Sequence, residues 1–211
     1  MTLLAGTDNA VANYETGDVE EGRTYDTYYL SAVIDAAATT YRLDKQKIHS
    51  SWKRQQILQN DPAEWDQDFD SDATNKPRIA EGRAYIPFSF SHKNSVSGTF
   101  QVFLKLYHLR VAVETQLGST WSSEITTSTG AVVKRTVTAV IDVQNIQFAI
   151  GDKVRLNITT DKAGAQVGQY YDIGCSPHNL DSENGANGLE PETYQEDRTD
   201  MHIKMPFLID V

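Results

Sequence analysis

The sequence contains one cysteine, Cys175, among 211 residues. A single cysteine excludes an intrachain disulfide, and a chain of this length buries enough surface to fold without a disulfide or a structural metal. No apolar run approaches the roughly 18 residues of a membrane span, and Met1–Asp8 lacks the basic and apolar segments of a secretory signal. These absences predict synthesis in a reducing cytoplasm and no membrane partner.

Clustered basic residues are also lacking, because the net charge is −10. Contacts with the nucleic-acid backbone require groups of Lys and Arg, so we expect no direct nucleic-acid partner. The charge is uneven, with net +4 over residues 82–162 and net −7 over each flanking segment. The acidic total favours solubility in water. An alternative is that the acidic ends pack against basic surfaces of the same chain or of a neighbour.

The N-terminal residues differ in composition from the rest and predict an extended acidic arm over 1–25, followed by one domain over 26–211. The arm holds five acidic residues and one arginine, without an apolar period. Ordering it costs roughly 1–2 kcal/mol per residue, which so few apolar groups do not offset, so we expect the arm to bind a neighbouring subunit. The expected partner-binding residues of the arm are Leu3, Leu4, Val11 and Tyr14.

A two-residue period runs through the centre of the chain and predicts a mostly β fold, an antiparallel β-sandwich of jelly-roll type with long loops. Apolar side chains alternate with polar ones, and turn residues separate the alternating segments. In one such segment the expected buried face consists of Phe100, Val102, Leu104 and Leu106. Val111 and Val113 continue the alternating pattern.

The last ten residues, 202–211, predict a closing strand that pairs with an early one, as jelly rolls require. The side chains expected on its apolar face are Ile203, Met205, Phe207, Ile209 and Val211. Two other segments are expected to be irregular. Residues 45–80 predict a helical and loop insertion with a short helix near 45–58, and the Asn/Gly-rich segment 177–199 predicts a long loop.

Motifs of known catalytic chemistry are absent, so we predict no catalytic residue and no cofactor. The histidines lack metal-ligand spacing and are interpreted as surface or packing residues: His49, His92, His108, His178 and His202. Cys175 and His178 are three residues apart. A nucleophile and base also need an orienting group, which the sequence does not supply, and a buried thiol is the favoured interpretation of Cys175.

One acidic segment could supply oxygen ligands to a calcium ion. Its carboxylates alternate with other residues: Asp66, Asp68, Asp70 and Asp72. Ser71 stands where an EF-hand loop needs glycine, and Pro77 stands where it needs the closing glutamate. We therefore favour a solvated acidic loop over a metal site.

The tryptophans Trp52, Trp65 and Trp121, with ten tyrosines, admit a second interpretation. Exposed aromatic rings on a β-sandwich can stack against sugars. Packing in the core or at an interface is the more common role of such rings and is the one we expect.

Two stretches resemble jelly-roll virion proteins of double-stranded DNA viruses, tailed phages especially. One runs from Gly82–Tyr85 through Thr99–Tyr107 to Ala149–Leu156 with its apolar-Gly-Asp turn, and the other is the apolar ending Ile203–Val211. The likeness is to decoration, cement or auxiliary capsid proteins. It implies a non-enzymatic homo-oligomer that binds the major capsid protein or other virion subunits and resides in the virion after synthesis in the host cytoplasm.

Two other functions remain open at the level of the sequence. One is a carbohydrate-binding or adhesion module on a β-sandwich. The other is a hydrolase that uses paired carboxylates among the 29 acidic residues.

Overall fold

The computed structural model describes residues 22–34, 40–46, 66–93, 98–129, 132–164, 170–173 and 201–208. These residues form strands and no helix, which confirms a mostly β fold. None of the described segments therefore forms an apolar helix that could span a membrane. The strands are β1 (Arg23–Ile34), β2 (Thr40–Asp44), β3 (Asp66–Ser71), β4 (Arg78–Lys93), β5 (Gly98–Arg110), β6 (Val113–Gln116), β7 (Trp121–Ser122), β8 (Thr126–Ser128), β9 (Val132–Phe148), β10 (Lys153–Gly164), β11 (Tyr170–Ile173) and β12 (His202–Leu208).

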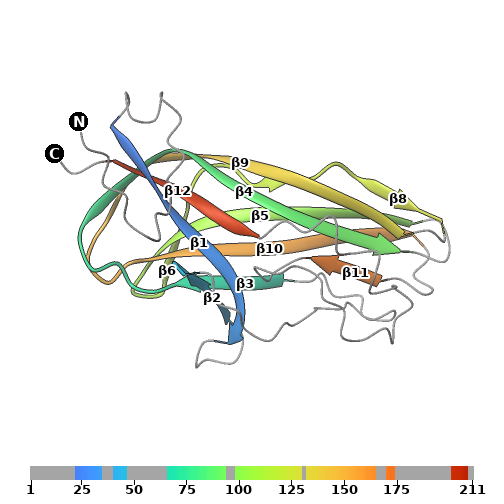
Figure 1. The fold of residues 1–211 in the computed structure, drawn as a ribbon, viewed down its shortest axis with the longest axis horizontal. Coiled ribbons are helices and arrows are strands. Elements are labelled where there is room, and N and C mark those ends of the chain that lie inside the picture. Colours follow the sequence, from blue (N-terminus) through green and yellow to red (C-terminus); the bar gives the residue numbers. More distant parts are fainter. Residues whose placement is uncertain are drawn as a thin grey trace, which may run out of the picture.

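The strands form one sheet, in the order β11-β4-β12-β1-β2-β3-β10-β5-β6. β9 pairs with β4, while β7 and β8 pair with β5. The long strands run lengthwise along the molecule as two antiparallel pairs, β4 with β9 and β5 with β10 (Figure 1). The sheet is mixed rather than purely antiparallel, because β2 and β3 pair in parallel.

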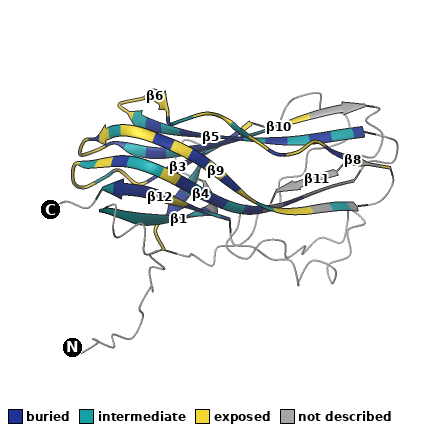
Figure 2. Ribbon diagram, turned by 90° about the horizontal axis from the view of Figure 1, so that it is seen from above, coloured by how far each residue is buried: buried dark blue, intermediate teal, exposed yellow. Residues whose placement is uncertain are grey.

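The sheet curls, so that strands distant in its order face one another. The ring of Phe90 in β4 lies 5.8 Å from that of Phe100 in β5, and the ring of Phe88 lies 5.7 Å from that of Trp121 in β7. Figure 2, which looks from above, shows β5 and β10 on one side and β1, β4 and β12 on the other. The apolar core fills the space between these two parts of the curled sheet.

The two-residue period of the sequence produces this core. All four side chains expected on the inner face of β5 are at most 1% exposed, namely Phe100, Val102, Leu104 and Leu106. β9 alternates in the same way, with Ala139 and Ile141 buried between exposed neighbours. Burying an aliphatic or aromatic side chain contributes roughly 1.5–3 kcal/mol, so these alternating faces are the main source of stability.

The final strand lies beside the first one, as expected. β12 pairs antiparallel with β1, from Arg23 opposite Leu208 to Tyr29 opposite His202. Ile203, Met205 and Phe207 are fully buried, and residues 209–211 lie outside the described part. The expected boundary of the arm is wrong by three residues, because Arg23, Thr24 and Tyr25 already belong to β1. Backbone pairing with β12 orders them despite their polar composition.

The expected insertion over 45–80 is also wrong in part. Residues 66–71 form β3, and β4 begins at Arg78. β3 lies inside the sheet between β2 and β10, and its residue Phe69 is fully buried in the apolar core. Lys45 and Gln46 form a bend after β2, whereas the rest of the expected helix and the 177–199 loop lie outside the described residues.

Candidate interaction surface

Three connections meet at the end of the sheet that lies at the left of Figure 1: the β3–β4 loop, the β5–β6 turn and the β9–β10 turn. Thr74 joins the first to the third. Its amide donates to the carbonyl oxygen of Asp152 at 2.7 Å, and its hydroxyl donates to the carbonyl oxygen of Ala149 at 2.6 Å. The amide of Gly151 donates to the carbonyl oxygen of Thr74 at 2.9 Å. The β3–β4 loop is therefore fixed to the β9–β10 turn.

Asp152 fixes the same turn to β5. Its carboxylate is buried, lies 2.6 Å from Nε2 of His108 and accepts hydrogen bonds from Arg110 Nη2 at 2.8 Å and the Ala149 amide at 2.7 Å. Arg110 Nη2 also donates to the carbonyl oxygen of Gln147 at 3.0 Å. The hydrogen bond from Arg110 is the main reason that the pKa of Asp152 lies well below its usual value; bonds from His108 and Ala149 act in the same direction, and burial opposes them.

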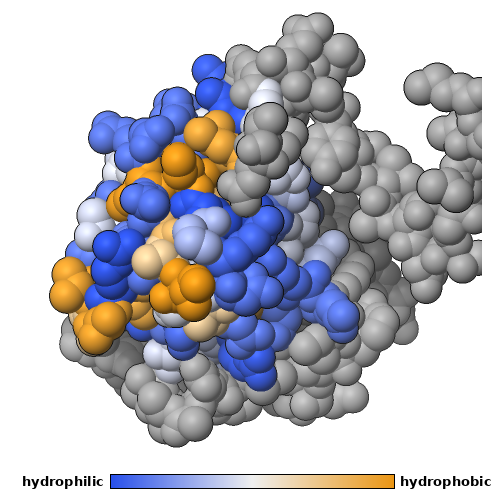
Figure 3. All heavy atoms as spheres, turned by 90° about the vertical axis from the view of Figure 1, so that its left-hand side faces the viewer, coloured by the Kyte–Doolittle hydropathy of each residue, from blue (hydrophilic) through white to orange (hydrophobic). Residues whose placement is uncertain are grey.

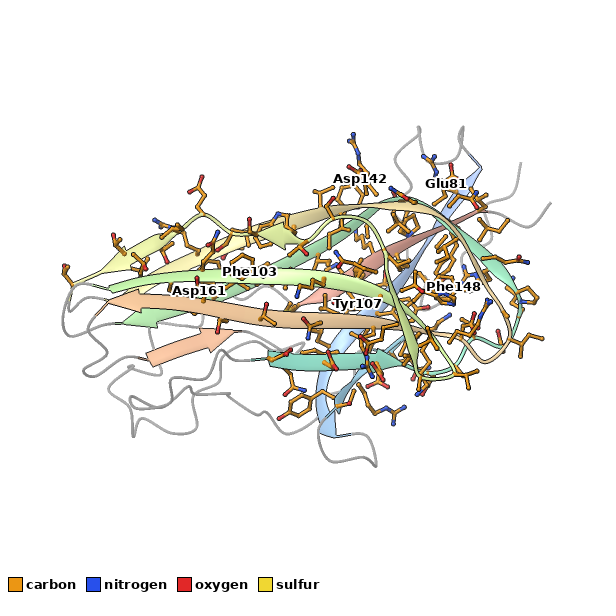
Figure 4. All side chains as sticks on the ribbon, turned by 180° about the vertical axis from the view of Figure 1, so that it is seen from behind. Glu81, Phe103, Tyr107, Asp142, Phe148 and Asp161 are labelled. Carbon is orange, nitrogen blue, oxygen red and sulfur yellow. The ribbon has the colours of Figure 1, made fainter. Side chains whose placement is uncertain are left out.

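His108 and Asp152 together act as a structural cross-link in this geometry. The His108 ring is buried, and its centroid lies 4.4 Å from that of Phe148, which is labelled in Figure 4. Its Nε2 lies beside the Asp152 carboxylate and its ring packs against Phe148. The sequence marks the Gly-Asp turn but carries no local signal that His108 and Arg110 are its partners.

Exposed apolar side chains occupy the two turns that this cross-link joins. Val111 is 93% exposed, Val113 65% and Ile150 68%. Figure 3 faces this end and shows hydrophobic side chains exposed in more than one place among hydrophilic ones. The alternating pattern that includes Val111 and Val113 does not continue β5, because β5 ends at Arg110 and the chain reverses there.

The β5–β6 turn holds its apolar residues in an unfavourable backbone conformation. Arg110 and Val113 pair across it, and both residues between them have positive φ: +47° at Val111 and +65° at Ala112. A two-residue turn with this geometry favours Asn-Gly, because the left-handed region is costly for other residues and especially for β-branched ones. The turn thus keeps an exposed valine where an asparagine would cost less.

The acidic segment, expected to be a loop, instead forms β3, which pairs with β10. Side chains of β10 contact its carboxylates. Arg155 donates to both carboxylate oxygens of Asp70, at 2.6 and 2.7 Å, and its Nη1 lies 3.0 Å from a carboxylate oxygen of Asp68. Asn157 Nδ2 donates to Asp66 and to Asp68. Asp72 lies beyond the strand and pairs with Arg42 at 3.1 Å. Among the described residues, no group of three or more His, Cys, Asp or Glu side chains is arranged to hold a metal ion.

Of the remaining candidate residues, only Trp121 lies within the described part of the chain, and it packs inside the fold. Trp121 is half-buried against Phe88, with the two rings at 80°, so it is a packing residue. The other candidates lie outside the described residues: Leu3, Leu4, Val11, Tyr14, Trp52, Trp65, Cys175 and His178.

Comparisons with known proteins leave the family of this chain open. No protein-family model matches, and no curated protein matches. Among solved structures, the chain is similar to a CocE/NonD family hydrolase of Staphylococcus aureus, SACOL2612, with TM-score 0.48 and 12% identity over 89% of this chain. It is similar to an aminopeptidase from the marine sediment archaeon Thaumarchaeota archaeon, with TM-score 0.47 and 8% identity over 89%, and to an alpha-amino acid ester hydrolase, with TM-score 0.44 and 12% identity over 88%.

The chain spans only part of these solved proteins: 37% of the first two and 34% of the third.

Proposed function

We propose that this chain is a non-enzymatic structural subunit that binds a neighbouring copy of itself through the end surface, defined as Val111, Ala112, Val113 and Ile150. The observation that carries the proposal is Val111, which is 93% exposed at a φ of +47°. Exposed apolar side chains among polar ones are typical of a protein interface. An apolar residue that is also conformationally costly has no benefit in the isolated chain, so we assign its benefit to association.

Charge favours a second copy as the occupant of this surface. The chain carries a net charge of −10, so contacts between copies through most surfaces bring like charges together. The segments 111–113 and 149–151 contain no charged residue. Two such segments can face one another across a two-fold axis without electrostatic repulsion.

The cross-link beneath the end surface supports the same role. Thr74, Arg110 and Asp152 tie the three connections to one another before any partner arrives. A surface that is already ordered loses less conformational entropy on binding, so less of the interaction free energy is spent on ordering.

The assembly that we favour is a viral shell, in which the homo-oligomer decorates or cements the major capsid protein. Support for this finer assignment comes from the sequence resemblance to virion proteins and from the mostly β fold. The hydrolase alternative receives less support, because Arg155 and Asn157 hold the carboxylates of β3, and Arg110 and His108 hold that of Asp152.

The test is sedimentation velocity over a range of protein concentrations. We expect the wild-type chain to self-associate and the Val111→Asp/Ile150→Asp variant to be monomeric. Ile125→Asp is the matched control, because Ile125 is 64% exposed but lies between β7 and β8, outside the end surface. A wild-type chain that stays monomeric at all concentrations, or a double variant that associates like the control, would refute the proposal.

A further inference from the structure

A pocket of about 430 Å³ opens between β1, β2 and the β3–β4 loop. Its volume lies within the roughly 300–1,000 Å³ of small-molecule sites. Its lining includes the acids Asp44 and Asp72, the bases Lys45 and Arg78, and the amides Gln46 and Asn75. Nothing in the proposed association of copies uses this pocket.

The charged groups of the pocket are already partnered by the protein. Asp26 accepts hydrogen bonds from Lys45 Nζ at 2.7 Å and from both terminal nitrogens of Arg78. Burial raises the pKa of Asp26, but the hydrogen bonds and charges of Arg78 and Lys45 outweigh burial and hold this pKa below its usual value. Asp26 is therefore ionised at neutral pH and neutralises much of their positive charge.

The carboxylates that line the pocket balance its cations. Lys45 and Arg78 share the lining with Asp44 and Asp72, and Arg42 Nη2 lies 3.4 Å from Asp44 Oδ1 and 3.1 Å from Asp72 Oδ1. The lining carries no net charge, so neither a phosphate nor a metal ion finds an excess of opposite charge. A neutral ligand matches this balance better than an ion.

Two amide side chains at the pocket are available to a ligand. Gln46 and Asn75 are exposed, and neither side chain makes a hydrogen bond to another described residue. Each amide offers both a donor and an acceptor, the combination that a hydroxyl group uses. Leu43 and Tyr28 also line the pocket but are almost fully buried, at 1% and 3% exposed, and Lys45 Nζ lies 5.6 Å from the centroid of the Tyr28 ring.

We propose that this pocket binds a neutral, hydroxyl-rich ligand of the saccharide class. The hydroxyls of a sugar pair with Gln46, Asn75 and the rim charges. The site is preformed, because Thr74 is bonded to the β9–β10 turn and Asp72 is bonded to Arg42 of β2. Binding therefore requires little ordering of the loop.

The test titrates the isotope-labelled full chain with glucose, galactose, mannose and N-acetylglucosamine, and with short oligomers of each, while amide chemical shifts are recorded. We expect saturable shifts with at least one neutral sugar, centred on 43–46 and 72–78 and insensitive to salt. Tighter binding of the oligomers than of the monomers would identify a glycan chain as the source of the ligand.

The discriminating variant is Gln46→Ala/Asn75→Ala, which removes exposed side chains without bonds to the rest of the described protein. Loss of two hydrogen bonds should weaken binding roughly tenfold or more. Gln144→Ala, an exposed amide on β9 that does not line the pocket, should bind like wild type. The proposal is overturned if no neutral sugar binds, if the double variant binds like the control, or if only inorganic phosphate or calcium produces shifts in this region.

Discussion

Replacing Val111-Ala112 by Asn-Gly separates the stability of the chain from its association. Both positions have positive φ, a region that costs an L-residue other than Gly or Asn about 1–2 kcal/mol. Val111 is 93% exposed, so its removal loses almost no burial. The strain relieved at Ala112 is partly offset by the extra freedom of glycine in the unfolded chain, about 0.5–1 kcal/mol. We expect Val111→Asn/Ala112→Gly to raise the free energy of unfolding by about 1–2 kcal/mol.

Denaturation by guanidinium chloride, followed by circular dichroism, measures this gain at a protein concentration where the chain is monomeric. The slope of the transition should not change, because the surface exposed on unfolding is the same. The melting temperature should rise by roughly 2–8 °C. The same variant should associate more weakly in the sedimentation assay, since its apolar tip is gone.

The control for strain is Val140→Asn. Val140 is 42% exposed but lies within β9, where valine suits the extended backbone, so this variant should be no more stable than wild type. Unchanged or reduced stability of the turn variant would refute the strain argument. A stabilised variant that associates like wild type would refute the assignment of the turn to an interface.

Two further substitutions test the core and the cross-link. Phe207→Asp should lower the free energy of unfolding by roughly 3 kcal/mol or more, because Phe207 is fully buried against Phe148 and the substitution places a charge in the core. An unchanged melting temperature would contradict this. Asp152→Asn should reduce stability most near neutral pH. Arg110, His108 and Ala149 lower the pKa of Asp152 from 3.8, so its contribution is complete above about pH 4 and is lost as the pH falls further. The difference in unfolding free energy from wild type should shrink on acidification, whereas Asp142→Asn, at an 84% exposed carboxylate, should show little difference at any pH.

The buried faces of the long strands could be predicted from the sequence because the two-residue period is local. Leu104 alternates with its neighbours whether or not its partner strands are known, and the structure places it in the core. The pairing of β12 with β1 was also predictable, since an apolar terminal strand must bury its face against another strand. Both inferences depend on burial alone.

The turn after β5 could not be predicted in the same way. Val111 and Val113 fit the alternating pattern, and no Gly, Asn or Pro in 108–113 marks the reversal. Turn signals in a sequence reflect low conformational cost, so a turn whose residues are costly is invisible to them. The positions where the pattern fails are for that reason the ones that we assign to function.

The acidic strand shows a second limit, because its partners are distant in the sequence. Asp66, Asp68 and Asp70 lie on one side of β3. In the sequence they belong to a run of four carboxylates within seven residues, a pattern that indicates a solvated loop. The groups that make a strand possible here are Arg155 and Asn157 of β10, 85 or more residues away. Arg155 bonds to both oxygens of Asp70 and also contacts Asp68. The positive charge on β10 therefore offsets the repulsion between the carboxylates of β3. Such a balance follows from strand register, which no local pattern of the acidic segment contains.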